Sequence, residues 1–216
     1  PYTTLFRSLI RQEVDADVEL LSAEQTRAEV NSAQFHGGLL QRNGVQMHVG
    51  RFGVGLAEAA ARRGAMIYEH TQVNDWKPQA GGYQVNTAKG SLHAGQVLLA
   101  TGACQHGDLG WYRRRIVPVG SFVIATGVLP QALIDQLLPQ RRAYVTSRMI
   151  GNYFRLTPDN RLLFGGRARF AMSDSVSDAK SGTVLHAAML NMFPSLAGVK
   201  IDYCWGGLVD MTSDRL

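Results

Sequence analysis

The sequence predicts a mixed α/β protein built from two interleaved domains. Its 216 residues suit one large domain or two small ones, at roughly 150 residues per domain. A strand–helix–strand pattern in the first half is followed by a run of short antiparallel strands, which is typical of mixed α/β folds. The composition, with 45% hydrophobic and 18% charged residues, argues against disorder, collagen and coiled coil.

Helices and short strands alternate in the first half of the chain. A capping-box pattern that starts at Ser22 predicts a short helix at 23–30. Apolar residues at helical spacing predict a clearer helix at 50–63, which Gly64 ends as a C-cap glycine. Short strands are expected at 65–69, 71–77, 82–87, 91–94 and 96–100.

Strands dominate the second half. A long strand is predicted at 115–127, and Pro130 opens a short helix at 130–137. An apolar stripe at helical spacing predicts a further helix at 178–193. The remaining strands are expected at 143–147, 151–157, 161–166 and 199–211.

Both ends of the sequence read as cut. The octapeptide Pro1–Ser8 matches the in-frame translation of a common sequencing-adapter oligonucleotide, so residues 1–8 are expected to be an artefact outside the fold. The chain stops at Leu216 directly after a strand-like stretch, with no terminal helix or polar tail. We therefore expect an internal piece of a longer protein.

Charge and composition exclude several classes of partner. The net charge is +5, and the basic residues are scattered without the basic face and interleaved aromatics of a nucleic-acid-binding module. No apolar run reaches the roughly 18 residues of a membrane span. Six histidines and two cysteines lack metal-ligand spacing. We expect no nucleic-acid, membrane or metal partner, and a cytoplasmic location suits the low cysteine count.

A glycine pair at the predicted helix start leaves a nicotinamide-binding alternative open. Gly53-Val-Gly55, with Asp75 downstream, is close to a dinucleotide fingerprint. Glu58 stands where the third glycine belongs, and it would compete with a pyrophosphate for the positive end of the helix. A glycine-rich start to an ordinary helix is the favoured interpretation.

Two further patterns are candidates for ligand contact. The run at 96–100 predicts a strand buried on both faces, and it leads into Ala100-Thr101-Gly102, small residues that let a ligand approach the backbone. A core strand with a simple turn is the alternative. Tyr153 and Arg155 alternate on one predicted strand, so they share a face and could bind a substrate carboxylate; a plain exposed face is the alternative. Ser121 lacks the second glycine of a nucleophile elbow and is interpreted as a strand residue.

Seven short motifs follow one another in a specific order and spacing over residues 9–216. They are His36–Leu39, Gly55–Ala60, Glu69–Val73, Val97–Ala103, Pro118–Val123, Arg161–Arg167 and Trp205–Leu216. Together they resemble the FAD-dependent amine and amino-acid oxidases related to D-amino-acid oxidase, glycine oxidase and sarcosine oxidase. The nearest resemblance is to the gamma-glutamylputrescine oxidase branch of that family.

The resemblance implies a domain organisation. An FAD-binding Rossmann-like domain would be interleaved with a mainly antiparallel substrate domain, both incomplete in this chain. Residues 48–106 and 209–216 would belong to the FAD-binding domain, and residues 9–47 and 107–208 to the substrate domain. The family's glycine-rich phosphate loop has no counterpart in the sequence, so the chain alone is expected to be inactive.

The resemblance also implies cofactor-binding positions. The backbone of Val73 would meet the adenine end of FAD. The turn formed by Ala100, Thr101 and Gly102 would lie near the ribose and diphosphate, and Asp214 would lead into the last flavin-binding segment. Gly207 stands where sarcosine-oxidase-like relatives carry the cysteine that attaches FAD, so non-covalent FAD is expected.

The implied reaction is the oxidation of a primary or secondary amine or amino acid to an imine, which water then hydrolyses. Electrons would pass to oxygen or another acceptor. Tyr153 and Arg155 would lie near the substrate pocket, and the family requires no side chain as obligatory acid or base. A flavin module that transfers electrons without acting as an oxidase is the other alternative, beside the nicotinamide-binding domain.

Overall fold

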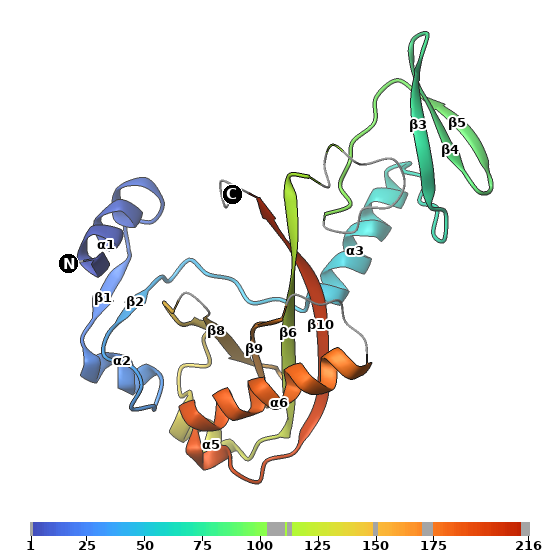
Figure 1. Ribbon diagram of the computed structural model, residues 1–216. Helices are drawn as coiled ribbons and strands as arrows, with labels where there is room; N and C mark the ends of the chain where they lie inside the picture. Colours follow the sequence, from blue (N-terminus) through green and yellow to red (C-terminus); the bar gives the residue numbers. More distant parts are fainter. Residues whose placement is uncertain (1, 103–110, 112–113, 149–150, 170–174, 213–216) are drawn as a thin grey trace. The chain divides into compact units, whose positions relative to one another are not determined.

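The computed structural model describes residues 2–102, 111, 114–148, 151–169 and 175–212 of the chain. The chain divides into two compact units, each formed from two separate stretches (Figure 1). The first unit comprises Pro1–Gln46 and Gly120–Gly207, and the second comprises Met47–Val119 and Leu208–Leu216. The prediction of a mixed α/β fold is confirmed.

A five-stranded sheet in the order β10-β6-β9-β8-β7 forms the centre of the first unit. Its strands are β6 (Ile116–Val128), β7 (Tyr144–Val145), β8 (Asn152–Leu156), β9 (Arg161–Arg169) and β10 (Ile201–Thr212). The pairs β6–β9, β9–β8 and β8–β7 are antiparallel. Each of these strands had been predicted, and the turn at 157–160 between β8 and β9 closes with a hydrogen bond from Asn160 N to Thr157 O.

Helices cover one face of this sheet and enclose the core. They are α5 (Gln131–Leu137), α6 (Ser175–Met192) and the short 3-10 helix η1 (Pro194–Leu196). Figure 1 shows α6 running across the strands, and Gly182 of α6 lies against Ile124 of β6 and Cys204 of β10. Phe154 at the centre of the core stacks on Phe164 at 5.8 Å between ring centroids. This burial of large apolar side chains is the main stabilising contribution to the unit.

The rest of the first unit is a smaller layer of helix and hairpin-like strands. It contains α1 (Tyr2–Glu13), β1 (Glu19–Leu21), α2 (Ala23–Glu29) and β2 (Gly38–Leu40). The predicted capping box is present, because Gln25 N donates to Ser22 Oγ at 3.1 Å and Ser22 N donates to Gln25 Oε1 at 2.8 Å. The prediction of a helix at 23–30 is therefore confirmed, together with the reason given for it.

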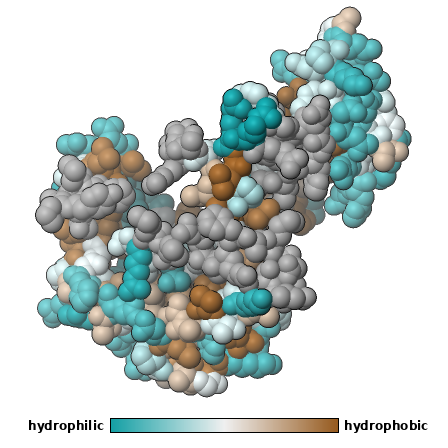
Figure 2. Space-filling model, viewed as in Figure 1, coloured by the Kyte–Doolittle hydropathy of each residue, from teal (hydrophilic) through white to brown (hydrophobic). Residues whose placement is uncertain are grey.

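The second unit combines a helix with a three-stranded antiparallel sheet. Helix α3 (Val49–Arg62) follows the N-cap His48, and the chain leaves it through Gly64 with φ +95°, as a C-cap glycine requires. The sheet consists of β3 (Val73–Gln79), β4 (Gly82–Thr87) and β5 (Gly90–Ala94) in sequence order. Figure 2 shows a mainly hydrophilic surface over these three strands.

Two strands predicted in the second unit are wrong. Residues 65–69 and 96–100 form no strand, and apolar side chains there are exposed, Leu98 to 90%. An apolar run becomes a strand only beside another backbone edge, and in the described part of the chain no strand pairs with either run. Residues Val97–Leu99 instead line a cavity of about 340 Å³ with Trp76 and Tyr83.

Candidate functional site

The face of the five-stranded sheet opposite the described helices carries the two residues predicted to contact substrate. On β8, Phe154 and Leu156 point into the core, while Tyr153 and Arg155 alternate with them. The structure therefore places both on the face opposite the helices, as the alternation predicted. We call this surface the open face, and it comprises Ser121, Val123, Tyr153, Arg155, Leu163, Gly165, Tyr203 and Trp205.

Tyr153 extends across β9 toward β6. Its backbone partner on β9 is Gly165, and a Cβ added at Gly165 would overlap the Tyr153 ring. The phenol oxygen lies 2.7 Å from Ser121 Oγ on β6. Ser121 is a strand residue, as predicted, but sequence reasoning missed this hydrogen bond because the residues are 32 positions apart.

Strand β10 contributes two aromatic side chains to the open face. Gly127 N donates to Lys200 O at 2.7 Å, and Gly206 lies against the Phe122 ring, so β10 runs antiparallel to β6. Cys204 faces α6, and alternation puts Tyr203 and Trp205 on the other side. Both aromatic side chains are exposed, to 59% and 43% respectively. The open face therefore has aromatic groups along both β8 and β10, with Ser121, Val123, Leu163 and Gly165 on the strands between them.

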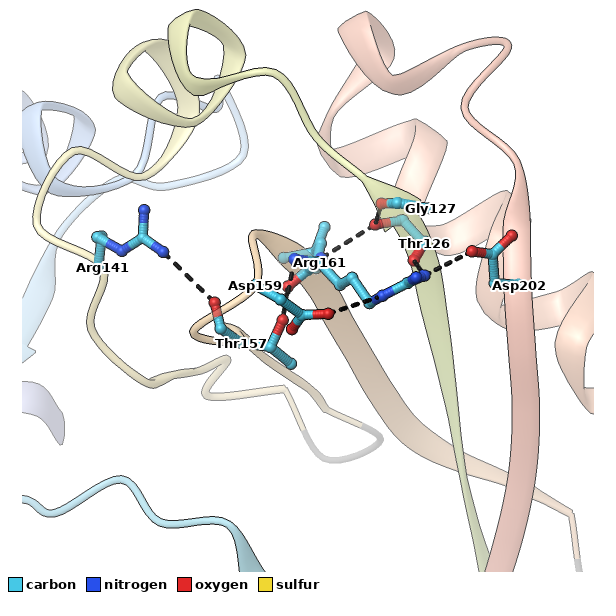
Figure 3. Close-up of polar contacts among 8 residues, drawn as sticks. Thr126, Gly127, Arg141, Thr157, Asp159, Arg161 and Asp202 are labelled. Atoms are coloured by element: carbon cyan, nitrogen blue, oxygen red, sulfur yellow. Dashed lines mark hydrogen bonds and ion pairs between the residues drawn. The ribbon is translucent and has the colours of Figure 1, made fainter.

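An ion-pair cluster at one end of the sheet holds β6, β9 and β10 together (Figure 3). Arg161 of β9 pairs with Asp159 at 3.0 Å and with Asp202 of β10 at 2.5 Å, and it donates to Thr126 O of β6 at 3.0 Å. The hydrogen bond from Arg161 holds the pKa of Asp202 below its ordinary value, and the Asp202 carboxylate in turn raises the pKa of Arg161. The charges satisfy one another, which is the arrangement of a structural cluster rather than a catalytic acid or base.

The residues predicted to bind the cofactor lie in the second unit. Val73 begins β3 opposite Thr87, and Ala100–Gly102 follow the exposed run at 96–100. Gly102 has φ +57°, and a Cβ there would stand 3.0 Å from Asp210 Oδ2 on β10. The structure thus brings the predicted turn beside the last strand. Asp214 lies outside the described residues.

The chemistry of this turn suits the ribose part of a dinucleotide. Small, exposed residues let a ligand approach the backbone closely, and the neighbouring Asp210 carboxylate can accept hydrogen bonds from hydroxyl groups. The same carboxylate would repel a diphosphate. The residues present therefore fit the sugar end of FAD.

The nicotinamide-binding alternative depends on Gly53 and Gly55, and the structure places both inside α3. They lie five and seven positions after the N-cap His48, whose Nδ1 accepts from Arg51 N at 3.2 Å. The expected position at the helix start is therefore wrong. A phosphate site requires free N–H groups at a helix N-terminus, and residues this far into a helix use theirs in the helical hydrogen bonds.

Cys204 is held away from the open face. Its thiol donates to Asp178 O of α6 at 3.2 Å, and burial raises its pKa, so it remains a neutral thiol.

Among the described residues, no group of three or more His, Cys, Asp or Glu side chains could hold a metal ion. Within the same residues, none of the helices has the length and apolar character needed to cross a membrane.

Comparisons with known proteins agree on one family. The family model described as FAD dependent oxidoreductase (DAO) matches residues 3–216. Gamma-glutamylputrescine oxidoreductase of Escherichia coli is 35% identical over 204 residues, covering 92% of this chain and 46% of that protein. The probable oxidoreductase OrdL of Haemophilus influenzae is 34% identical over 204 residues, with 91% and 45% covered. The chain thus spans about half the length of these curated relatives.

Solved structures share the fold. The crystal structure of glycine oxidase from Geobacillus kaustophilus superposes with a TM-score of 0.78 and 21% identity, over 99% of this chain and 56% of that one. That of L-proline dehydrogenase from P. horikoshii gives a TM-score of 0.74 at 14% identity, over 99% and 58%. The family model covers almost the whole sequence, and the chain belongs to the FAD-dependent oxidoreductase family of D-amino-acid oxidase relatives.

Proposed function

We propose that the protein containing this chain oxidises a primary or secondary amine or amino acid to an imine, which water hydrolyses. FAD, when bound, supplies the acceptor for the electron pair taken from the carbon next to the amine. The electrons then pass to oxygen or another acceptor. The observation that carries the proposal is the open face with Tyr153 and Arg155 on β8, in a chain of an FAD-dependent oxidoreductase family.

The open face suits an amine that also carries a carboxylate. An Arg guanidinium recognises a carboxylate through its planar fork of N–H donors, and the Tyr153 phenol can donate a further hydrogen bond. The exposed rings of Tyr203 and Trp205 can pack against the apolar part of such a molecule and exclude water. Glycine, sarcosine and gamma-glutamylputrescine all fit this description, and all three are named by relatives of the chain.

Cofactor binding is proposed for the second unit. Val73 would meet the adenine end of FAD, and Ala100, Thr101 and Gly102 would lie near its ribose and diphosphate. Asp214 would lead into the last flavin-binding segment, within a cofactor domain of residues 48–106 and 209–216. Residues 9–47 and 107–208 would form the substrate domain. The two compact units, divided near residues 46, 119 and 207, support this assignment.

Two residues of β10 support non-covalent attachment of FAD. Gly207, at the position where sarcosine-oxidase-like relatives carry the attaching cysteine, has no side chain to offer. Cys204 keeps its thiol protonated and bonded to α6, which supports the absence of a flavin–sulfur bond. The proposed partner is a small-molecule amine or amino-acid substrate. The proposed location is the cytoplasm, which the low cysteine count of the chain supports.

The test is flavin reduction by amines in the protein expressed from the complete reading frame. Glycine, sarcosine, gamma-glutamylputrescine and putrescine would be added anaerobically, and bleaching of the flavin absorbance would be followed. We expect at least one carboxylate-bearing amine to bleach the flavin, and admission of oxygen then shows whether peroxide forms. A flavoprotein that none of these amines reduces, but that an electron donor does, would favour the electron-transfer alternative.

A further inference from the structure

We propose that Ser121 is a positioning residue, which fixes the Tyr153 phenol on the open face so that it can hold a substrate carboxylate. The inference rests on the proposed function, and it assigns a role to a residue that the sequence analysis interprets only as a strand residue. Its basis is the short contact between the two hydroxyl groups and the way the sheet is built around them.

The sheet leaves a path for the phenol between β8 and β6. Neighbouring strands lie about 4.8 Å apart, so a side chain from β8 reaches β6 only by crossing β9. The residue at the crossing is Gly165, where a Cβ would overlap the ring of Tyr153. At the far end, Ser121 Oγ meets the phenol oxygen at 2.7 Å, a normal O–H···O distance.

The pairing of β6 with β9 is irregular at this point, because one step along β6 is matched by two steps along β9. The register between β6 and β9 shifts between Gly120 and Ser121, opposite Arg169 and Arg167. Bulges of this kind re-aim a side chain and often occur beside functional sites. Here the extra residue lies on β9, next to the pairing of Arg167 with Ser121, so the irregularity borders the contact between Ser121 and the phenol.

Either hydroxyl can donate in this hydrogen bond, and the proposed role requires Ser121 to be the donor. When Ser121 donates to the Tyr153 oxygen, the phenol proton remains available for a substrate oxygen. Accepting one hydrogen bond also polarises the phenol and strengthens the bond it donates. Ser121 would then act through Tyr153 without touching the substrate, and the loss of its hydroxyl would weaken binding more than turnover.

The kinetic test compares Ser121→Ala, Ser121→Thr, Tyr153→Phe and the double variant S121A/Y153F in the FAD-loaded protein from the complete reading frame. With gamma-glutamylputrescine, S121A should raise KM about three- to tenfold, the effect of one hydrogen bond, with kcat changed less than about twofold. Ser121→Thr should restore KM, and S121A should add nothing in the Tyr153→Phe background. Putrescine, which has no carboxylate, should show no dependence on Ser121.

The matched control is Ser91→Ala. Ser91 is an exposed strand residue whose Oγ donates to Asn86 Oδ1 at 2.8 Å, and it lies on β5 of the other unit. This variant should leave KM unchanged. An S121A enzyme with wild-type KM, or an S121A effect that persists in full in the Tyr153→Phe background, overturns the positioning role.

A second readout does not depend on turnover. Isotope-labelled tyrosine, with Tyr153→Phe to assign the signal, reports the surroundings of the phenol by NMR. The Tyr153 signal should shift in S121A and return in Ser121→Thr; an unmoved signal overturns the inference alone, because catalysis is not involved. The Tyr153 signal could instead shift in S121A while no amine reduces the flavin. That pair of results would overturn the proposed function, and with it the role of Ser121 toward a substrate.

Discussion

Gly165 is the residue on which the arrangement of Tyr153 depends. Gly165→Ala places a methyl group where the Tyr153 ring now lies, so we expect a loss of about 1–3 kcal/mol in the free energy of unfolding, as for an overpacked site. Combining it with Tyr153→Ala should remove most of that loss. Denaturant unfolding measures both, with Gly44→Ala as control because nothing lies within 4 Å of a Cβ there. Equal losses in the single and combined variants would contradict the proposed packing.

Asp202 links acid stability to the Arg161 cluster. Its folded pKa lies below the ordinary value, so the stabilisation is present above the unfolded pKa and is lost as pH falls through the folded one. We expect Asp202→Asn to show a shallower loss of stability than the wild type between about pH 5 and 2. Thermal unfolding at a series of pH values checks this, with the exposed Asp17→Asn as control. If Asp202→Asn and the wild type lost stability equally steeply as pH falls, the proposed contribution of Asp202 would be contradicted.

At Tyr144 we expect the opposite pH dependence, a loss of folding stability as pH rises. Its ring stacks on Phe154 at 5.1 Å, its hydroxyl donates to Glu29 O at 3.1 Å, and burial raises its pKa to about 12. The stabilisation of the neutral phenol is complete below its ordinary pKa of 10.0 and is lost as pH rises through about 12. Tyr144→Phe should therefore remove part of the alkaline loss, at a cost of about 1 kcal/mol at neutral pH. Unfolding curves across this range test it, and an unchanged alkaline slope would be the contrary result.

At the scale of elements, helix α2 depends on its cap. The helix has seven residues, too few to be stable alone, and the capping box at Ser22 satisfies two of its free N–H groups. Ser22→Ala should lower the free energy of unfolding by about 1 kcal/mol, while Ser22→Asp, which keeps an acceptor, should lower it less. Equal stabilities of the alanine variant and the wild type would show that the cap contributes nothing.

Helices and hairpin strands were predictable because their signals are local. The cap at Ser22, the glycine at position 64 and the turn after Thr157 act within a few residues of the element they end or begin. The strands expected at 65–69 and 96–100 were wrong because strand formation there depends on a signal that is not local. Their apolar composition is correct for a buried strand, but a strand also needs a neighbouring edge, which lies elsewhere in the sequence.

At the scale of the whole molecule, the order of the motifs predicted the family, while the contacts within the site could not be predicted. Alternation on one strand was enough to place Tyr153 and Arg155 on a common face. The bond between Ser121 and Tyr153, and the pair formed by Arg161 with Asp202 over 41 positions, depend on strand order and register. Those are set by packing across the sheet, which spacing along the chain does not reveal.

The central claim, FAD binding, is tested most directly by a visible absorption spectrum. The protein from the complete reading frame would be purified without added cofactor and then precipitated with acid. We predict flavin absorption bands in the native protein that move entirely to the supernatant, because Gly207 offers no side chain for attachment and burial keeps the Cys204 thiol protonated. A colourless protein that also fails to take up added FAD would contradict the account, and flavin retained in the precipitate would contradict non-covalent binding.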